Sequence, residues 1–314
     1  MLYIGIDVGG TNLKAGLVNE KGEILATEKT PLGEFPGAEG FARTLSGLAE
    51  AVMRKGGAAL EDIEYVGIGI PGAVSGGEIL YTANIPMSHV PMEKLFRRYL
   101  DLPLLLGNDA DCAAVGEWSC GAGRGTKNFV VVTLGTGIGG GLILNGKLHT
   151  GMGAGGEVGH IVIVSGGTPC NCGRRGCWEA YASATGLIRL TKEAMAAHPE
   201  SALHTVAAEN GGVEGRTAFQ AAQMGDETAL ALCGEYARYL ATGLTDLVNI
   251  LHPEAVALGG GVAAAPEQLL LKPVRDIVAR ECYARHTDQV PRIVRAELGN
   301  DAGIIGAALL GRAI

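Results

Sequence analysis

A pattern of strands and glycine turns that occurs twice most constrains how this chain can fold. Near the N-terminus, the apolar run Leu2–Val8 is broken by Gly9-Gly10-Thr11, after which a second apolar run begins. Further along, Phe129–Leu134 is broken by Gly135-Thr136-Gly137 in the same way, and Gly141–Leu144 follows. In each copy a turn that contains Asn leads to a third strand. A repeated unit of this kind indicates an internal duplication and predicts two lobes.

Around these two copies, apolar periodicity predicts helices and strands in alternation, which is an α/β pattern. Helical spacing places Phe41, Leu45, Leu48 and Val52 on one face of a helix over residues 38–55. No linker rich in Pro or Ser separates the halves, so we expect the lobes to meet at a hinge. Further helices are expected over 228–251, 266–284 and 302–313. The smaller N-terminal lobe is expected over 1–110, together with the C-terminal helix at about 300–314. The larger lobe is expected over 111–299 and contains a metal site.

Composition narrows the class of protein. The 314 residues carry a formal net charge of −8, which argues against a broad nucleic-acid footprint. No run of about 18 apolar residues is present, so we expect no membrane span. The N-terminus reaches Asp7 without a basic region, so we expect no secretory signal and a cytoplasmic location. The 50 glycines lie beside apolar runs, where they suit tight turns and close approach to ligands.

Both glycine turns have the composition of a phosphate-binding loop. Glycine lets backbone N–H groups point at phosphate oxygens with no Cβ in the way, and Thr11 and Lys14 add donors. Asp7 would repel phosphate, so its expected partner is Mg²⁺ carried with ATP. One such turn would also suit a plain hairpin, but two matched copies favour a shared triphosphate. The residues expected at the nucleotide are Asp7, Gly9, Gly10, Thr11, Asn12, Lys14, Gly135, Thr136, Gly137, Gly139, Gly259, Gly260 and Gly261.

Two features of these turns limit the prediction. No Walker sequence with its Gly-Lys-Ser/Thr ending is present, so a P-loop enzyme is excluded. The Gly259–Gly261 turn follows an expected strand and would pass close to an adenine base, or it is a simple turn between a strand and a helix.

A candidate catalytic base follows another expected strand. Asn108 and Asp109 come at the carboxyl end of that strand, which is where ligands bind in open α/β sheets. A hydroxyl that attacks a γ-phosphoryl group needs a carboxylate to orient it and to take its proton. Asp109 fits that role, although an Asp before a helix is also an ordinary N-cap. Asp111 is a rival candidate, but we expect it inside the helix.

A cysteine cluster predicts a metal site. Cys170, Cys172 and Cys177 form a C-x-C-x₄-C pattern, and His160 lies ten residues upstream. Three thiolates and one imidazole make a closed tetrahedral zinc site of the structural type. Such a zinc would pin the loop with Glu157 and His160 against the segment with Glu179. The alternatives are buried free thiols and a solvated Glu157.

Together these motifs resemble the ROK (repressor, open reading frame, kinase) family, in its bacterial glucokinase branch, over essentially the whole chain. The resemblance rests on the Gly-Glu-x-Gly-His motif that ends at His160 and on the Cys-x-Cys-Gly-x-x-Gly-Cys-x-Glu motif that ends at Glu179. It implies an actin-like ATPase (ribonuclease H-like) fold and a homodimer or homotetramer. It also implies Asp109 as the base, sugar contacts from Asn84, Asn108, Asp109, Glu157, His160 and Glu179, and zinc ligands His160, Cys170, Cys172 and Cys177.

The sequence departs from the family in one segment. Family glucokinases often carry an aromatic residue, commonly Trp, shortly after the Asn that matches Asn84, and residues 85–89 contain none. Glucose is the expected substrate, phosphorylated at its 6-hydroxyl, but N-acetylmannosamine, N-acetylglucosamine, fructose and allose stay open. A sugar-responsive repressor would need a DNA-binding segment before Asp7, and only six residues precede it. A sugar sensor without turnover is the other alternative.

Overall fold

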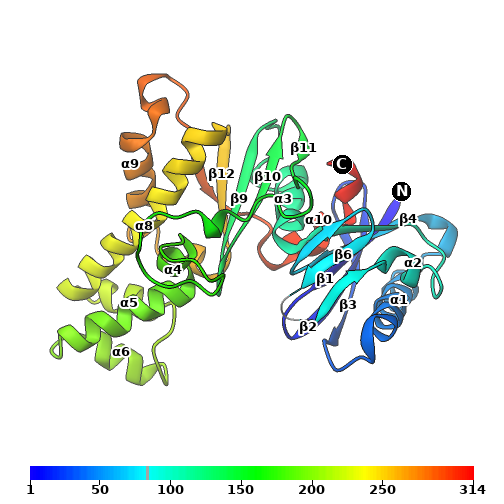
Figure 1. Ribbon diagram of the computed structural model, residues 1–314, viewed down its shortest axis with the longest axis horizontal. Coiled ribbons are helices and arrows are strands. Elements are labelled where there is room, and N and C mark those ends of the chain that lie inside the picture. Colours follow the sequence, from blue (N-terminus) through cyan, green and yellow to red (C-terminus); the bar gives the residue numbers. More distant parts are fainter. Residues whose placement is uncertain (83–84) are drawn as a thin grey trace. The chain divides into compact units, whose positions relative to one another are not determined.

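Two five-stranded sheets with the same strand order form the frame of the protein (Figure 1). The computed structural model describes residues 1–82 and 85–314. The first sheet has the order β3-β2-β1-β4-β8, and the second has the order β11-β10-β9-β12-β13. In each sheet the three strands of the repeated unit lie side by side at one edge, and two strands from later in the chain extend the sheet on the other side. This matching order confirms the predicted duplication. The strands are β1 (Leu2–Val8), β2 (Asn12–Asn19), β3 (Ile24–Pro31), β4 (Ile63–Ile70), β8 (Leu104–Asn108), β9 (Phe129–Leu134), β10 (Ile138–Leu144), β11 (Lys147–Leu148), β12 (Ala255–Gly259) and β13 (Arg292–Arg295).

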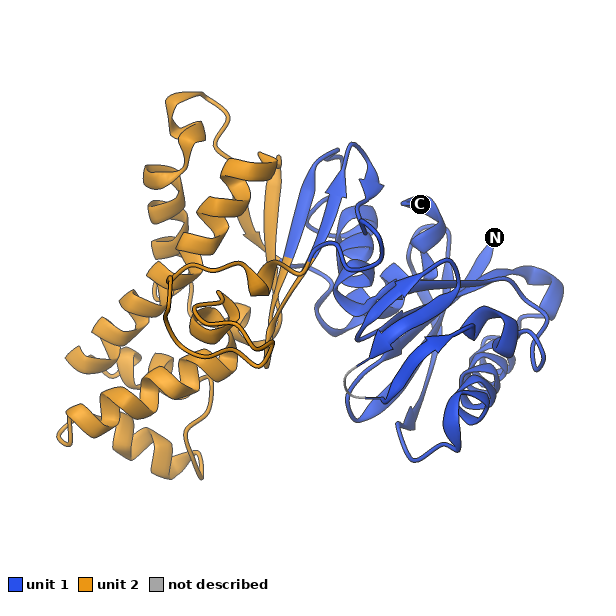
Figure 2. Ribbon diagram, in the orientation of Figure 1, with its two compact units in different colours: residues 1–131, 141–156, 296–314 blue, residues 132–140, 157–295 orange. Residues whose placement is uncertain are grey.

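Contacts divide the chain into two compact units (Figure 2). Unit 1 contains residues 1–131, 141–156 and 296–314, and unit 2 contains residues 132–140 and 157–295. The boundary therefore passes through β9 and β10. Unit 1 continues past residue 110, but compact units and the lobes of a fold need not share boundaries, so the lobe division stays a prediction. The helices are α1 (Gly37–Lys55), α2 (Met92–Phe96), α3 (Asp109–Cys120) and α10 (Ala302–Ala308) in unit 1, and α4 (Glu179–Ala182), α5 (Ala184–Ala197), α6 (Leu203–Glu209), α7 (Thr217–Gln223), α8 (Glu227–Leu251) and α9 (Leu271–Glu281) in unit 2.

In unit 1, α10 lies directly on the first sheet because a row of glycines crosses three strands. Gly16, Gly5 and Gly67 are neighbours on β2, β1 and β4. A Cβ on Gly5 or Gly67 would overlap a backbone carbonyl of α10, and a Cβ on Gly16 would overlap the side chain of Ile304. The glycines of this row therefore serve close packing between elements, whereas the sequence predicted glycines at turns and at sites of close approach to ligands.

The neighbouring helix α3 approaches α10 in the same way. A Cβ on Gly306 of α10 would overlap the carbonyl of Cys112, and a Cβ on Gly116 of α3 would lie 2.5 Å from the carbonyl oxygen of Ala302. The helix α1 packs against strands β1, β2 and β3. The four apolar residues predicted to share one face of α1 are all buried, which confirms that amphipathic pattern.

Some boundaries differ from the prediction. The C-terminal helix was expected to reach residue 313, but α10 ends at Ala308. The Tyr65 hydroxyl donates to the carbonyl of Ala308 at 2.7 Å and accepts from the N–H of Gly311 at 3.0 Å, so it satisfies the groups at the helix end. The helix expected over 266–284 is shorter, because residues 266–270 form turns before α9 begins.

Several elements were not predicted. They include a third, smaller sheet, β5 (Ala73–Ser75), β6 (Glu78–Thr82) and β7 (Met87–Val90), and the helices α5, α6 and α7. These strands hold three to five residues, which is too short for a clear alternation. Among the residues that the structure describes, no helix combines the length and the apolar composition needed to cross a bilayer.

The glycine row generates a matched pair of stability predictions. Gly67→Ala should lower the free energy of unfolding by about 3 kcal/mol or more, because the new Cβ overlaps backbone that cannot rotate away. Gly47→Ala should raise it by about 0.5–1 kcal/mol, because Gly47 is an exposed residue inside α1 with open space around its Cβ position. Urea unfolding of both variants measures the difference. Equal effects of the two substitutions would contradict the packing argument.

Candidate functional site

The candidate base lies in unit 1, where β8 ends and α3 begins. The N-cap of α3 is Asn108, whose Oδ1 accepts from the N–H groups of Ala110 at 2.8 Å and Asp111 at 3.4 Å. Its Nδ2 donates to the carbonyl of Gly72 at 3.0 Å, which links the end of β8 to the turn after β4. The N-cap alternative for Asp109 is therefore wrong, because its neighbour takes that role. One Asp109 oxygen accepts from Ala110 N–H at 2.9 Å, and the side chain reaches the surface.

The charge of Asp109 acts on a second carboxylate of unit 1, that of Asp7. Asp7 lies opposite Lys14 in the β1–β2 register. Desolvation by burial raises the pKa of Asp7, the charge of Lys14 lowers it, and the charge of Asp109 raises it. Desolvation likewise raises the pKa of Asp109, against the opposing effect of its backbone hydrogen bonds. Two carboxylates that resist ionisation next to each other favour a bound cation or a hydrogen-bond donor.

The first glycine turn, Gly9-Gly10-Thr11, connects β1 to β2 directly after Asp7 and Val8. The N–H of Gly9 donates to the carbonyl of Asn12 at 3.0 Å, and the carbonyl of Thr11 accepts from Leu32 N–H at 2.9 Å. A Cβ on Gly10 would meet open space. A Cβ on Gly303, in the first turn of α10, would lie 3.0 Å from Cγ of Asp7, so glycine at this position leaves room for the carboxylate.

The second glycine turn lines a cavity in unit 2 of about 570 Å³. Gly135 and Thr136 lie on one wall, and the segment that begins at Gly261 lies on another. The structure thus brings residues of both glycine turns that were predicted to bind the nucleotide in this unit to the walls of one cavity. The exposed surface of the walls is mainly apolar, with some polar side chains among the lining residues, as is common in small-molecule sites. The cavity is lined by Leu134, Gly135, Thr136, Ala184, Glu214, Gly215, Arg216, Phe219, Gln220, Gln223, Gly261, Val262, Ala264, Ala265 and Pro266.

One wall of this cavity was not predicted from the sequence. It is formed by α7 and the loop before it. Phe219 is buried on α7, while Gln220 and Gln223 present amide groups. Glu214 and Arg216 form an ion pair at 2.7 Å. No local motif marks these residues, and only the chain's return from α7 to the turn makes them neighbours of Thr136.

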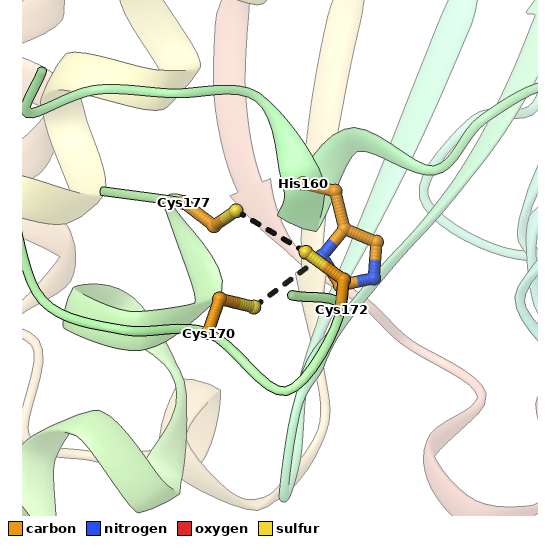
Figure 3. A group of neighbouring side chains, drawn as sticks. All are labelled: His160, Cys170, Cys172 and Cys177. Atoms are coloured by element: carbon orange, nitrogen blue, oxygen red, sulfur yellow. Dashed lines mark hydrogen bonds between the residues drawn. The ribbon is translucent and has the colours of Figure 1, made fainter. Parts of the chain in front are cut away.

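The four predicted metal ligands meet in unit 2 (Figure 3). One ligand atom from each of His160, Cys170, Cys172 and Cys177 lies within 4.8 Å of all the others. Nδ1 of His160 is 3.7 Å from Sγ of Cys170, and Sγ of Cys172 is 3.6 Å from Sγ of Cys177. Ligand atoms at the corners of a zinc tetrahedron lie about 3.4–3.8 Å apart, given Zn–N and Zn–S bonds of about 2.0–2.3 Å. The donor set and its spacing fit zinc.

The loops around the cluster are shaped to hold it. The chain turns tightly at Cys170, whose N–H donates to the carbonyl of Arg174 at 2.9 Å and whose carbonyl accepts from Gly173 at 3.0 Å. Gly176 has φ +82°, and a Cβ there would overlap the carbonyl of Val164. His160 presents Nδ1 to the cluster, so its Nε2 stays available for another partner.

The predicted sugar residues lie in both units. Asn108 and Asp109 belong to unit 1, and Glu157, His160 and Glu179 belong to unit 2. Glu157 is exposed, and one oxygen of Glu179 accepts from the N–H of Ile138 at 2.9 Å. Asn84 lies outside the described residues. The sugar contacts stay predictions.

Comparison with known proteins adds a decisive observation. The ROK family pattern matches residues 3–314. A glucokinase from Streptomyces coelicolor is 38% identical over 317 residues, which cover 99% of this chain and 98% of that protein. The chain belongs to the ROK family.

Other ROK proteins extend this likeness. The crystal structure of a ROK family glucokinase from Streptomyces griseus, in complex with glucose and AMPPNP, matches with a TM-score of 0.79 and 38% identity over 98% of each chain. An N-acetylmannosamine kinase from Escherichia coli is 33% identical over 99% of each chain. The predicted actin-like ATPase fold is confirmed, because the ROK sugar kinases among the similar structures have that fold.

The metal cluster generates one prediction about composition. Metal analysis of this ROK protein should find about one zinc per chain, and Cys172→Ser should lose that zinc together with thermal stability, because a structural zinc contributes folding energy. The control is Cys120→Ser, a half-buried thiol outside the cluster, which should retain the zinc. A folded wild-type protein without zinc would contradict the prediction.

The raised pKa of Asp109 generates a prediction about pH. Ionising a carboxyl group whose folded-state pKa lies above its ordinary value of 3.8 costs stability, and this cost grows as the pH rises through the folded-state pKa. Asp109→Asn should therefore stabilise the protein at pH 7 and lose this advantage as the pH falls toward the ordinary value. Melting temperatures over that range measure it, with the exposed Asp288→Asn as the control. A destabilised Asp109→Asn variant at pH 7 would contradict the prediction.

Proposed function

We propose that this protein is an ATP-dependent sugar kinase that transfers the γ-phosphoryl group of ATP to the 6-hydroxyl of glucose. The observation that carries the proposal is the position of Asp109 directly after a strand. Its neighbour Asn108 caps the helix α3, so the carboxylate of Asp109 is not used as the cap. Full-length likeness to glucokinases at 36–38% identity supports glucose as the acceptor.

The proposed mechanism gives Asp109 the role of base. Its carboxylate accepts a hydrogen bond from the attacking hydroxyl, orients it in line with the γ-phosphorus and takes its proton. The raised pKa makes this carboxylate a better proton acceptor than an ordinary Asp. Asn108 keeps the start of α3 in place through its bonds to Ala110 and Gly72.

The two glycine turns hold the nucleotide in this proposal. Backbone N–H groups of both turns bind phosphate oxygens, and Asp7 faces the Mg²⁺ that accompanies ATP. The apolar cavity beside Thr136 accepts the adenine. The proposed nucleotide residues are Asp7, Gly9, Gly10, Thr11, Asn12, Lys14, Gly135, Thr136, Gly137, Gly139, Gly259, Gly260 and Gly261.

The sugar and the zinc share one side chain. His160 would bind zinc through Nδ1 and leave Nε2 to contact a sugar hydroxyl. Zinc has a structural role, since its four protein ligands leave no position for water. We include in the proposal a cytoplasmic location, where ATP is available, and a homodimer or homotetramer, as the family resemblance implies. The proposed sugar contacts are Asn84, Asn108, Asp109, Glu157, His160 and Glu179.

A second candidate acceptor is N-acetylmannosamine. Its support is the full-length likeness to the Escherichia coli kinase, together with the lack of an aromatic residue at 85–89. N-acetylglucosamine, fructose and allose remain further candidates. A sugar sensor without turnover is the alternative from another class.

A substrate panel tests the proposal. Metal-loaded protein with ATP and Mg²⁺ should release ADP in a sugar-dependent way, and glucose should have the highest kcat/KM among hexoses and N-acetylhexosamines. Asp109→Asn should lower kcat about a hundredfold or more, because proton transfer by a placed group contributes that much. The exposed Asp288→Asn should retain wild-type turnover. Activity with N-acetylmannosamine instead of glucose would select the second candidate, and no turnover with any sugar would favour a sensor.

A further inference from the structure

The second glycine turn rests on the segment that follows the metal cluster. Its backbone carbonyls point toward the start of α5, where Ala184 N–H donates to the carbonyl of Gly135 at 2.9 Å. The Thr185 hydroxyl donates to the carbonyl of Thr136 at 2.8 Å. Within the described residues, no protein acceptor takes the N–H of Thr136 or Gly137. The anchoring bonds therefore leave these donors to a ligand.

Glu179 supplies the third anchor of the turn. Its Oε2 accepts from the N–H of Ile138, the first residue of β10, at 2.9 Å. A Cβ on Gly137 would overlap this same oxygen, so the carboxylate lies directly against the turn. A side chain at position 137 would thus displace the carboxylate of Glu179, in addition to affecting any contact with phosphate.

The other side of the carboxylate faces the metal cluster. Oε1 of Glu179 is 3.9 Å from Sγ of Cys170. Glu179 follows the ligand Cys177 by two residues, and the intervening Trp178 is fully buried. The backbone N–H of Trp178 donates to the carbonyl of Ile161 at 2.8 Å. Ile161 follows the predicted metal ligand His160 in the chain. The position of the cluster therefore determines the position of Glu179.

Trp178 has little freedom to relax. Its Nε1 donates to the carbonyl of Tyr239 on α8 at 3.0 Å. A Cβ on Gly243, one turn later on α8, would overlap the indole ring. A shift of the cluster loop is thus transmitted to Glu179 instead of being absorbed by Trp178.

We propose that Glu179 is a positioning residue for the phosphate donor, through which the metal cluster holds the turn Gly135–Ile138 in the shape that binds ATP. This inference rests on the proposed kinase function and adds to it. The sugar contact assigned to Glu179 by resemblance uses the same side chain. Loss of the metal then weakens nucleotide binding even when no sugar is present.

The test measures binding of Mg²⁺·AMPPNP by calorimetry without sugar, on the metal-loaded full chain. Glu179→Ala should raise Kd about tenfold or more, because Ile138 N–H loses a charged acceptor. Glu179→Gln should stay within about threefold of wild type, because an amide oxygen can still accept that bond. Glu209→Ala is the matched control, since Glu209 is an exposed carboxylate on α6 that does not line the cavity, and its nucleotide Kd should not change. Equal Kd values for wild type and Glu179→Ala would overturn the inference.

Metal removal completes the test. Chelation and desalting, followed by Mg²⁺ alone, should weaken nucleotide binding by wild type about as much as Glu179→Ala does, and should add little in that variant. Equal further losses in both proteins would overturn the coupling. Circular dichroism establishes that each sample is folded, and Thr185→Val, at an exposed residue, gives a second anchor variant that should also bind more weakly. A wild type without nucleotide binding would refute the proposed function itself.

Discussion

Unit 1 depends on the close packing of the α10 backbone against the glycine row of the first sheet. Because Gly5, Gly16 and Gly67 carry no side chains, the backbone of α10 touches the sheet, and Gly306 lets α3 touch α10 in turn. The carboxylates of Asp7, on β1, and Asp109, on α3, therefore belong to elements held together by backbone contact. Close packing of this kind is rigid, because no side chain can change rotamer to relieve strain.

Unit 2 holds its glycine turn by other means. The first turn is closed by backbone bonds such as Leu32 N–H to the carbonyl of Thr11. The second turn is anchored by Glu179, Ala184 and Thr185, which follow the cysteine cluster in the chain. The two copies of the repeated unit thus share strand order and turn composition, while the neighbours that support the turns differ.

The electrostatics of unit 1 disfavour the ionised forms of two carboxylates. Burial raises the pKa values of Asp7 and Asp109, and the charge of Asp109 adds to the effect on Asp7. A cation at Asp7 and a hydroxyl donor at Asp109 would relieve it, so the site favours the ligands that the proposed reaction needs.

Local patterns in the sequence predicted the repeated strand–turn–strand unit, the amphipathic face of α1, the cysteine cluster with His160, and Asp109 at a strand end. Each depends on residues close together in the chain, where period and spacing carry the information. The small sheet β5–β7, the helices α5–α7 and the wall of the cavity at Phe219 were missed, since their strands are short or their partners distant.

Only the tertiary structure decided that Asn108 bonds to Gly72, that Gly5, Gly16 and Gly67 form one row, and that Glu179 bonds to Ile138. The physical reason is that register between strands and the return path of the chain set these contacts, and neither is encoded in a local window. The sequence by itself determined which groups are available for chemistry, and the packing of distant segments decided which of them work together.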